Sequence, residues 1–276
     1  MRISVYTAIK NSIANDLHAI DMVRHHLPLA DEIVINEGFS TDGTFERIRD
    51  LDPKVKIVRT VWETPKDQQW CLAFKDAARL ACTGDWCIHL DCDEFIPEWE
   101  FADIRAYLER ATEPMIPVEF VNFYGNYKVY HAAPERVRWP ARKMIIHRNI
   151  PEIEFWGDAS NVKMRDVPFD WNVSPKTFSV HHFGMVRDAA TLRQKWWIQG
   201  RAVSGRSTLV KPPKMLFKLF PHKWDDPQYF HDLAIYDGPV IQAVKNNPNE
   251  FVRDRFSLHR QLLQRPAKPI PASVHP

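Results

Sequence analysis

The chain has 276 residues, enough for one large domain or two small ones with a substantial core. Hydrophobic residues make up 45% and charged residues 26% of the sequence, which argues against disorder over most of its length. The net charge of +2 does not by itself indicate a nucleic-acid-binding or membrane-binding protein.

Strands and helices are predicted to alternate through the first half. Strands are expected over 3–9, 32–36, 55–61 and 86–90, because these segments are rich in β-branched and apolar residues. Three helices are predicted between these strands. The first covers 13–27, the second begins after an N-cap at Thr41 or Asp42, and the third covers 66–82. This order predicts an α/β fold with a mostly parallel sheet flanked by helices.

The second half is predicted to be mixed α+β. It contains a helix near 104–108, strands over 117–124, 143–147 and 178–180, a polar turn over 154–159, and a helix near 192–197. Without a linker rich in Gly or Ser, we expect one domain with halves at 1–112 and 113–265, followed by a loose tail over 266–276.

Three carboxylates end the fourth predicted strand. Asp91, Asp93 and Glu94 follow an apolar run, which places them at the carboxyl edge of the sheet, where open α/β sheets bind ligands. Paired aspartates supply oxygen ligands suited to Mg²⁺ or Mn²⁺. An Asp-x-Asp pair alone also fits an ordinary acidic loop, so the rest of the chain must decide.

The first half resembles the family 2 glycosyltransferases of the GT-A fold. The resemblance rests on Lys10-Asn11 after the first strand, on the turn NEGFSTDGT at 36–44, on Gly84-Asp85-Trp86 and on Asp91-Cys92-Asp93-Glu94. Phe39 looks like an insertion in that turn. The second half resembles a subset of bacterial members through FYGNY at 123–127, GDA at 157–159 and HFGMVR at 182–187.

The resemblance implies a nucleotide-sugar donor, most often a UDP-sugar, and a Mn²⁺ or Mg²⁺ ion. The nucleoside would be framed by residues at the ends of the first strands and by the third helix, namely Thr7, Lys10, Asn11, Glu37 and Asp67 or a glutamine next to it. Asp91 would face the ribose or the metal, Asp93 would bind the metal directly, and His182 would be a third contact with the metal or diphosphate.

An inverting transfer also needs a carboxylate base within hydrogen-bond reach of the acceptor hydroxyl. Asp158 is the candidate base, with Glu154 and Asp166 as alternatives. A turn-capping role for Asp158 and a core role for His182 stay open.

Two other functions are compatible with parts of the pattern. A sugar-nucleotide pyrophosphorylase would need a glycine-rich phosphate loop after the first strand, and residues 8–11 contain no glycine. A non-catalytic carbohydrate-binding relative would keep the fold without turnover.

The acceptor is expected to be a glycan, a lipid-linked molecule or another hydroxyl compound. The basic residues between Arg136 and Arg148, around Trp139, motivate a nucleic-acid acceptor as a minority alternative. The four cysteines lack the spacing of a zinc site, and no segment has the length of a signal sequence or membrane span. We therefore expect a cytoplasmic protein, free or attached at a membrane surface.

Overall fold

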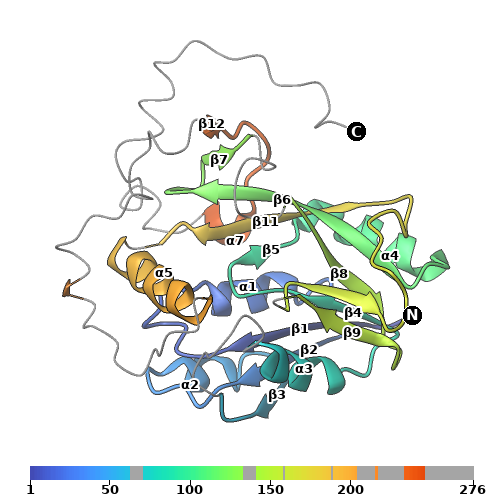
Figure 1. Ribbon diagram of the computed structural model, residues 1–276, viewed down its shortest axis with the longest axis horizontal. Coiled ribbons are helices and arrows are strands. Elements are labelled where there is room, and N and C mark those ends of the chain that lie inside the picture. Colours follow the sequence, from blue (N-terminus) through green and yellow to red (C-terminus); the bar gives the residue numbers. More distant parts are fainter. Residues whose placement is uncertain are drawn as a thin grey trace.

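A computed structural model of the chain describes residues 1–62, 71–132, 141–157, 159–187, 189–203, 215–216 and 233–245 (Figure 1). The strands are β1 (Ile3–Ile9), β2 (Glu32–Glu37), β3 (Val55–Arg59), β4 (Trp86–His89), β5 (Glu94–Phe95), β6 (Met115–Tyr124), β7 (Val129–His131), β8 (Arg142–Arg148), β9 (Ile153–Trp156), β10 (Asn161–Met164), β11 (Phe178–Met185) and β12 (Leu233–Ile235). The helices are α1 (Ala19–His26), α2 (Thr44–Ile48), α3 (Leu72–Leu80), the 3-10 helix η1 (Glu98–Glu100), α4 (Phe101–Arg110), α5 (Ala189–Val203) and α7 (Gln242–Lys245).

The first half supplies the parallel part of the central sheet. Its strands lie in the order β3-β2-β1-β4, and every neighbouring pair is parallel. All residues of β2 and β4 are buried, as expected for strands covered on both faces. The carboxyl ends of these strands share one edge, so the acids that follow β4 lie there.

The second half extends the sheet with mixed strand directions. β8 pairs antiparallel with β4, and β6, β7 and β12 continue from it, each antiparallel to its neighbour. β11 runs parallel to β6 and antiparallel to the short β5. Its register places His182 opposite both Asn122 of β6 and Glu94 of β5. β11 therefore connects the two halves at the acidic segment.

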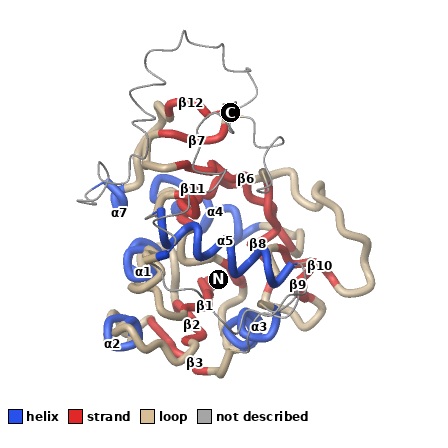
Figure 2. Tube along the Cα trace, turned by 60° about the vertical axis from the view of Figure 1, so that its left-hand side comes forward, coloured by secondary structure: helices blue, strands red, loops and turns tan. Residues whose placement is uncertain are grey.

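Two apolar cores lie on opposite faces of the sheet, because neighbouring residues of a strand point to opposite faces. Val5 of β1 belongs to the core that includes α1 and α4, whereas Tyr6 belongs to the core that includes α3 and the β9–β10 hairpin. Figure 2 shows these helices on both sides of the strands. The prediction of an α/β fold with a flanked, mostly parallel first half and a mixed second half is confirmed.

Three local predictions were wrong. The first helix begins at Ala19 rather than near Ile13, because Asn11 and Asp16 adopt left-handed backbone angles (φ 50° and 51°) that interrupt a helix. The expected polar turn over 154–159 is partly strand: β9 and β10 form a hairpin. The strand predicted to end near residue 180 continues to Met185, so His182 lies inside β11 rather than after it.

Candidate functional site

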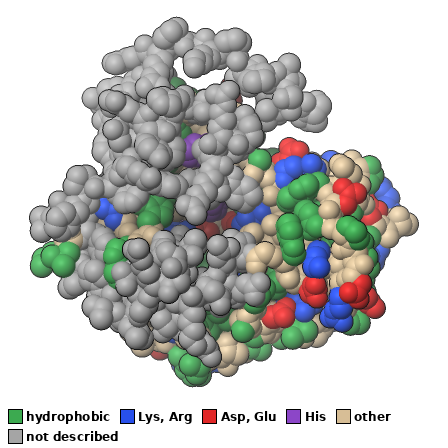
Figure 3. Space-filling model, in the orientation of Figure 1, with side chains coloured by type: hydrophobic (Ala, Val, Ile, Leu, Met, Phe, Trp, Pro, Cys, Tyr) green, Lys and Arg blue, Asp and Glu red, His purple; other side chains and the backbone are tan. Residues whose placement is uncertain are grey.

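Charged side chains converge where β4 ends and β11 passes. Asp91, Asp93 and Glu94 come from the segment after β4, and His182 comes from β11. The backbone is tied across this junction, because the Phe183 amide donates to the Asp93 carbonyl oxygen at 2.8 Å. Figure 3 shows acidic, basic and histidine side chains close together near the middle of one face of the molecule.

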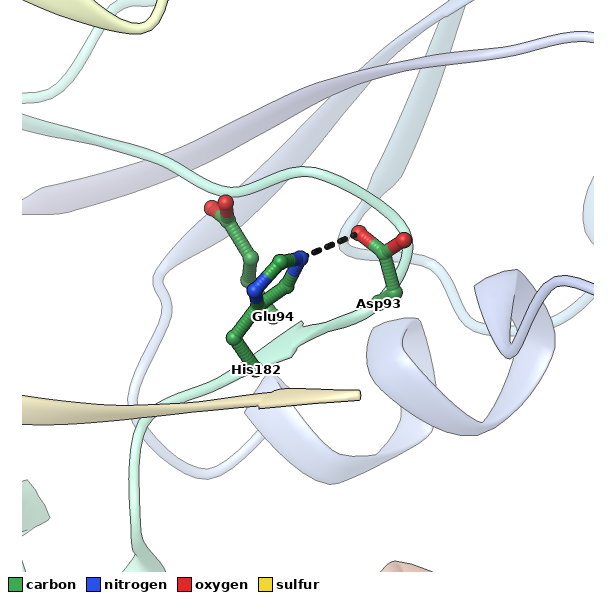
Figure 4. Close-up of side chains that lie close together, drawn as sticks. All are labelled: Asp93, Glu94 and His182. Carbon is green, nitrogen blue, oxygen red and sulfur yellow. Dashed lines mark ion pairs between the residues drawn. The ribbon is translucent and has the colours of Figure 1, made fainter. Parts of the chain in front are cut away.

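One oxygen of Asp93 faces the ring of His182. The Nε2 atom of His182 lies 3.9 Å from Asp93 Oδ1 (Figure 4), and one ligand atom each from Asp93, Glu94 and His182 lie within 4.8 Å of one another. His182 Nδ1 donates to Asn122 Oδ1 at 2.8 Å, which leaves the lone pair on Nε2. Burial lowers the pKa of His182 to about 3, so the ring is neutral at pH 7 and able to bind a metal.

The other oxygen of Asp93 is paired with cations. Asp93 Oδ2 contacts the Arg187 guanidinium, and Lys195 Nζ of α5 lies 3.8 Å from it. Burial alone would raise the pKa of Asp93, but Arg187 and Lys195 more than offset it, so the pKa lies well below its usual range. Burial and the neighbouring Arg187 lower the pKa of Lys195 to about 8. The carboxylate is therefore ionised, with one oxygen directed at His182.

Asp91 belongs to a neighbouring network rather than to this group. Its Oδ1 atom lies 2.8 Å from Lys75 Nζ of α3, and its Oδ2 atom lies 3.9 Å from Lys143 Nζ of β8. Lys143 also contacts the buried Glu94, whose Oε2 atom accepts the Asp91 amide at 3.0 Å. Burial opposes ionisation of Asp91, but Lys75 outweighs it and keeps its pKa below the usual value. Of the three predicted metal ligands, the structure brings Asp93 and His182 together, with Glu94 beside them in place of Asp91.

Of the residues predicted to frame the nucleoside, Asn11 and Glu37 hold the turn after β2. Asn11 Oδ1 accepts the Thr41 amide at 2.8 Å. Glu37 is fully buried, and its carboxylate accepts the Phe39 amide at 3.1 Å, the Ser40 amide at 2.5 Å and Arg59 Nε at 2.7 Å. Both side chains therefore fix backbone that borders the carboxyl edge.

Phe39 has a defined place in this turn. Its backbone is left-handed (φ 54°), and the Arg59 guanidinium lies 4.2 Å from its ring centroid. The same guanidinium lies 4.1 Å from the ring centroid of Phe45, so Arg59 contacts two aromatic rings as well as Glu37.

The remaining nucleoside candidates differ in their setting. Thr7 is fully buried on β1, two residues before its end. Lys10 Nζ lies 5.8 Å from the ring centroid of Trp62, which stacks flat on Phe74 at 4.0 Å. Asp67 lies outside the described residues. The roles of these residues toward a nucleoside stay predictions.

The predicted base, Asp158, also lies outside the described residues, between Gly157 and Ala159 of the β9–β10 turn. Its alternatives, Glu154 and Asp166, have different surroundings. Glu154 is held by Lys163 at 3.3 Å and Arg165 at 3.4 Å, while the next residue, Phe155, turns inward and contacts His89. Asp166 is exposed in the loop after β10.

Several polar residues of the site, most of them buried, could not be identified from the sequence. Lys75 sits one residue after the apolar Phe74 on a helix face, where a solvent-facing lysine is the usual reading. Asn122 and Lys195 carried no motif, and Arg187 was seen only as the end of HFGMVR. Lys143 belongs to the basic cluster between Arg136 and Arg148. Its place in the predicted strand over 143–147 is the feature of the sequence that indicates its burial.

The basic cluster does not form a surface patch in its described part. Lys143 and His147 are buried, and the Arg148 guanidinium lies 4.2 Å from the ring centroid of Trp86. Arg136, Arg138 and Trp139 lie outside the described residues. The nucleic-acid alternative therefore gains no support. Within the described segments, no helix combines the length and apolar composition that crossing a bilayer requires.

Comparisons with known proteins returned solved structures only. No protein-family model matches the chain, and no curated protein matches it significantly. The chain is similar to TarS residues 1–349 from S. aureus in complex with UDP-GlcNAc, with 13% identity over 79% of this chain and 69% of that chain and a TM-score of 0.43. Against the longer S. aureus TarS structure, it spans 42% of that chain, with 14% identity and a TM-score of 0.42.

It is also similar to glucosyl-3-phosphoglycerate synthase from Mycobacterium tuberculosis in complex with Mn²⁺, UDP and glucosyl-3-phosphoglycerate. Here the identity is 14%, the coverage 75% of this chain and 81% of that chain, and the TM-score 0.39. A functional assignment for this chain rests on its own residues and their geometry.

Proposed function

We propose that the protein is a metal-dependent glycosyltransferase of the family 2 type, which transfers a sugar from a nucleotide-sugar to an acceptor hydroxyl with inversion. The observation that carries this proposal is the pair formed by Asp93 Oδ1 and the neutral His182 Nε2, 3.9 Å apart at the carboxyl edge of the sheet. UDP-sugars are the first donors to test, because the sequence resemblance implies them.

The metal-ligand atoms of Asp93 and His182 suit Mn²⁺ or Mg²⁺. A carboxylate oxygen and an imidazole nitrogen are ligands that first-row divalent ions accept, and two bonds of about 2.1 Å reach across the distance between these atoms. When bound, such an ion supplies positive charge that stabilises the diphosphate leaving group. Asn122 keeps the His182 ring in the tautomer that offers Nε2.

Two further cations support departure of a diphosphate. Arg187 and Lys195 both lie against Asp93 Oδ2, whereas His182 lies near Oδ1. A diphosphate bound at the metal would come within reach of the same two side chains, which bind phosphate oxygens well. Arg187 and Lys195 would therefore share their charge between Asp93 and the leaving group.

Asp158 is proposed as the base that takes the proton from the acceptor hydroxyl. This assignment is supported by its place in the sequence, next to Ala159, whose carbonyl oxygen lies 3.1 Å from the same Lys75 Nζ that pairs with Asp91. Glycans, lipid-linked molecules and other hydroxyl compounds are the acceptor classes to screen, with the protein placed in the cytoplasm or at a membrane surface.

Thermal melting with nucleoside diphosphates tests the proposal. A ligand at about 100 times its Kd stabilises the folded state by about 2.7 kcal/mol, which shifts the melting temperature of a chain this size by several degrees. We expect the largest shift with UDP and Mn²⁺ together. Asp93→Asn should lose the metal-dependent part, whereas Asp50→Asn, an exposed carboxylate paired with Arg49, should keep it.

Each other outcome has a distinct meaning. The absence of a shift with every nucleotide, with and without metal, would refute the glycosyltransferase assignment. A shift with UDP but no hydrolysis or transfer of any UDP-sugar would favour the non-catalytic relative.

A further inference from the structure

Lys75 is a buried lysine that joins two separate parts of the site. Only 9% of its side chain is exposed, and it projects from α3 with Nζ 2.8 Å from Asp91 Oδ1. The same Nζ donates to the carbonyl oxygen of Ala159 at 3.1 Å. Lys75 therefore contacts both Asp91 and the turn between β9 and β10.

That turn has an unfavourable backbone that its surroundings must hold. Gly157 and Ala159 both adopt left-handed angles (φ 69° and 60°), and Ala159 is fully buried. A left-handed alanine costs of order 1 kcal/mol and persists only where neighbouring contacts fix it. The hairpin is also anchored by Asn161 Oδ1, which accepts the Met144 amide at 2.8 Å. The contact with Lys75 is made at the left-handed residue itself.

Neutralising Asp91 is not sufficient to explain Lys75. Lys143 lies 3.9 Å from the other oxygen of Asp91 but pairs more closely with Glu94, so Lys75 is the main cation at Asp91; an ion pair with Asp91 does not by itself require the second contact of Lys75, with Ala159. Three donor hydrogens on one ammonium group allow Lys75 to bind the carboxylate and the Ala159 carbonyl at once. The contact therefore has a geometric consequence: one ammonium group links the Asp91 carboxylate directly to the turn.

We infer that Lys75 is a positioning residue, which fixes the β9–β10 turn relative to Asp91 and thereby relative to the bound donor. This inference rests on the proposed function, in which Asp91 faces the donor and the turn contributes the base. Lys75 itself touches neither substrate. Its loss should affect transfer to an acceptor more than binding of the donor, because the donor contacts remain while the base loses its placement.

The experiment compares Lys75→Met with Lys54→Met. Lys54 is a matched control, since its Nζ also donates to backbone carbonyl oxygens, those of Leu27 and Ala30 at 2.8 Å each, away from the site. Amide hydrogen exchange of the peptide covering 157–160 reports on the turn without any substrate. Steady-state kinetics separate the kcat for transfer from the donor KM, and isothermal titration gives the affinity for UDP.

For Lys75→Met we expect exchange in this peptide to rise about tenfold and the kcat for transfer to fall about 100-fold, while donor KM and UDP affinity stay near wild type. Lys54→Met should match wild type in all of these measurements. Unchanged exchange and unchanged transfer in Lys75→Met would overturn the inference. So would a loss of UDP affinity as large as the loss of transfer, since Lys75 would then act on the donor.

A second comparison covers the case in which Lys75→Met does not fold. Exchange at 157–160 is then compared between Asp91→Asn and the double variant Asp91→Asn/Lys75→Met, which leaves no unpaired carboxylate at position 91. Faster exchange in the double variant supports the inference, and equal exchange overturns it. If the wild-type protein binds no nucleotide-sugar, the proposed function fails, whereas the exchange data still decide whether Lys75 holds the turn.

Discussion

Removing Lys143 should leave a buried carboxylate without its cation. Glu94 is 1% exposed, and Lys143, which contacts it, is 6% exposed. In Lys143→Met, Asp91 keeps Lys75 at 2.8 Å, so Glu94 is the group that loses its charge partner. Burial already raises the pKa of Glu94, and loss of Lys143 should raise it further.

Protonation of Glu94 limits how much unfolding free energy the protein can lose in Lys143→Met. Breaking a buried ion pair costs about 3–5 kcal/mol. Glu94 escapes part of this cost by taking up a proton, which for an ordinary glutamate requires about 3.7 kcal/mol at pH 7 and about 1.6 kcal/mol at pH 5.5. The free energy of unfolding should therefore fall by about 3–4 kcal/mol at pH 7, and by less than half of that at pH 5.5.

Urea unfolding of wild type and Lys143→Met at both pH values measures this difference. Glu94→Gln/Lys143→Met is the control, since it removes both charges and should recover most of the stability lost at pH 7. A loss below about 1 kcal/mol at pH 7, or a loss that is the same at pH 5.5, would refute the argument that Glu94 is held ionised by Lys143.

Three further outcomes are expected. Asp93→Ala should remain folded by circular dichroism but lose Mn²⁺-dependent turnover, and unchanged turnover would remove Asp93 from the metal site. Asp158→Asn should bind UDP normally and transfer sugar about 10²–10⁴ times more slowly, whereas full activity would exclude it as the base. Burial lowers the pKa values of His26 and His181 to about 3, so below about pH 6.5 only the unfolded chain takes up their protons. The free energy of unfolding in urea should be highest above pH 6.5 and should fall as the pH decreases. An unfolding free energy that does not change between pH 7 and 5 would contradict this reasoning.

The strands of the first half could be predicted because parallel strands buried on both faces leave uninterrupted apolar runs. Ile33 to Ile35 and Trp86 to Ile88 are of this kind, and the acids that follow these strands mark the carboxyl edge. The first helix was placed too early because Ile13 and Leu17 keep helical spacing, while the left-handed Asn11 and Asp16 have no clear signature in sequence.

The candidate site could be predicted where it lies next to a strand end and not where it depends on tertiary packing. Asp93 and His182 were paired through motifs. The lysines Lys75 and Lys143 were not, because a lysine becomes buried only when a distant carboxylate compensates its charge. The four-residue strands of the β9–β10 hairpin are too short to show an alternation, so the segment looked like a polar turn.

The pairing of β5 with β11 has a consequence for how the protein matures. Asp93 and Arg187 meet although 94 positions separate them along the chain, so this contact cannot form until β11, which is synthesised late, pairs with the two-residue strand β5 from the first half. A nascent or truncated chain that lacks β11 would present Asp93 without Arg187 and without the His182 imidazole, while Asp91 and Glu94 would keep Lys75 and Lys143. If Asp93 and His182 bind a metal as proposed, metal binding would require that β11 has already paired with β5.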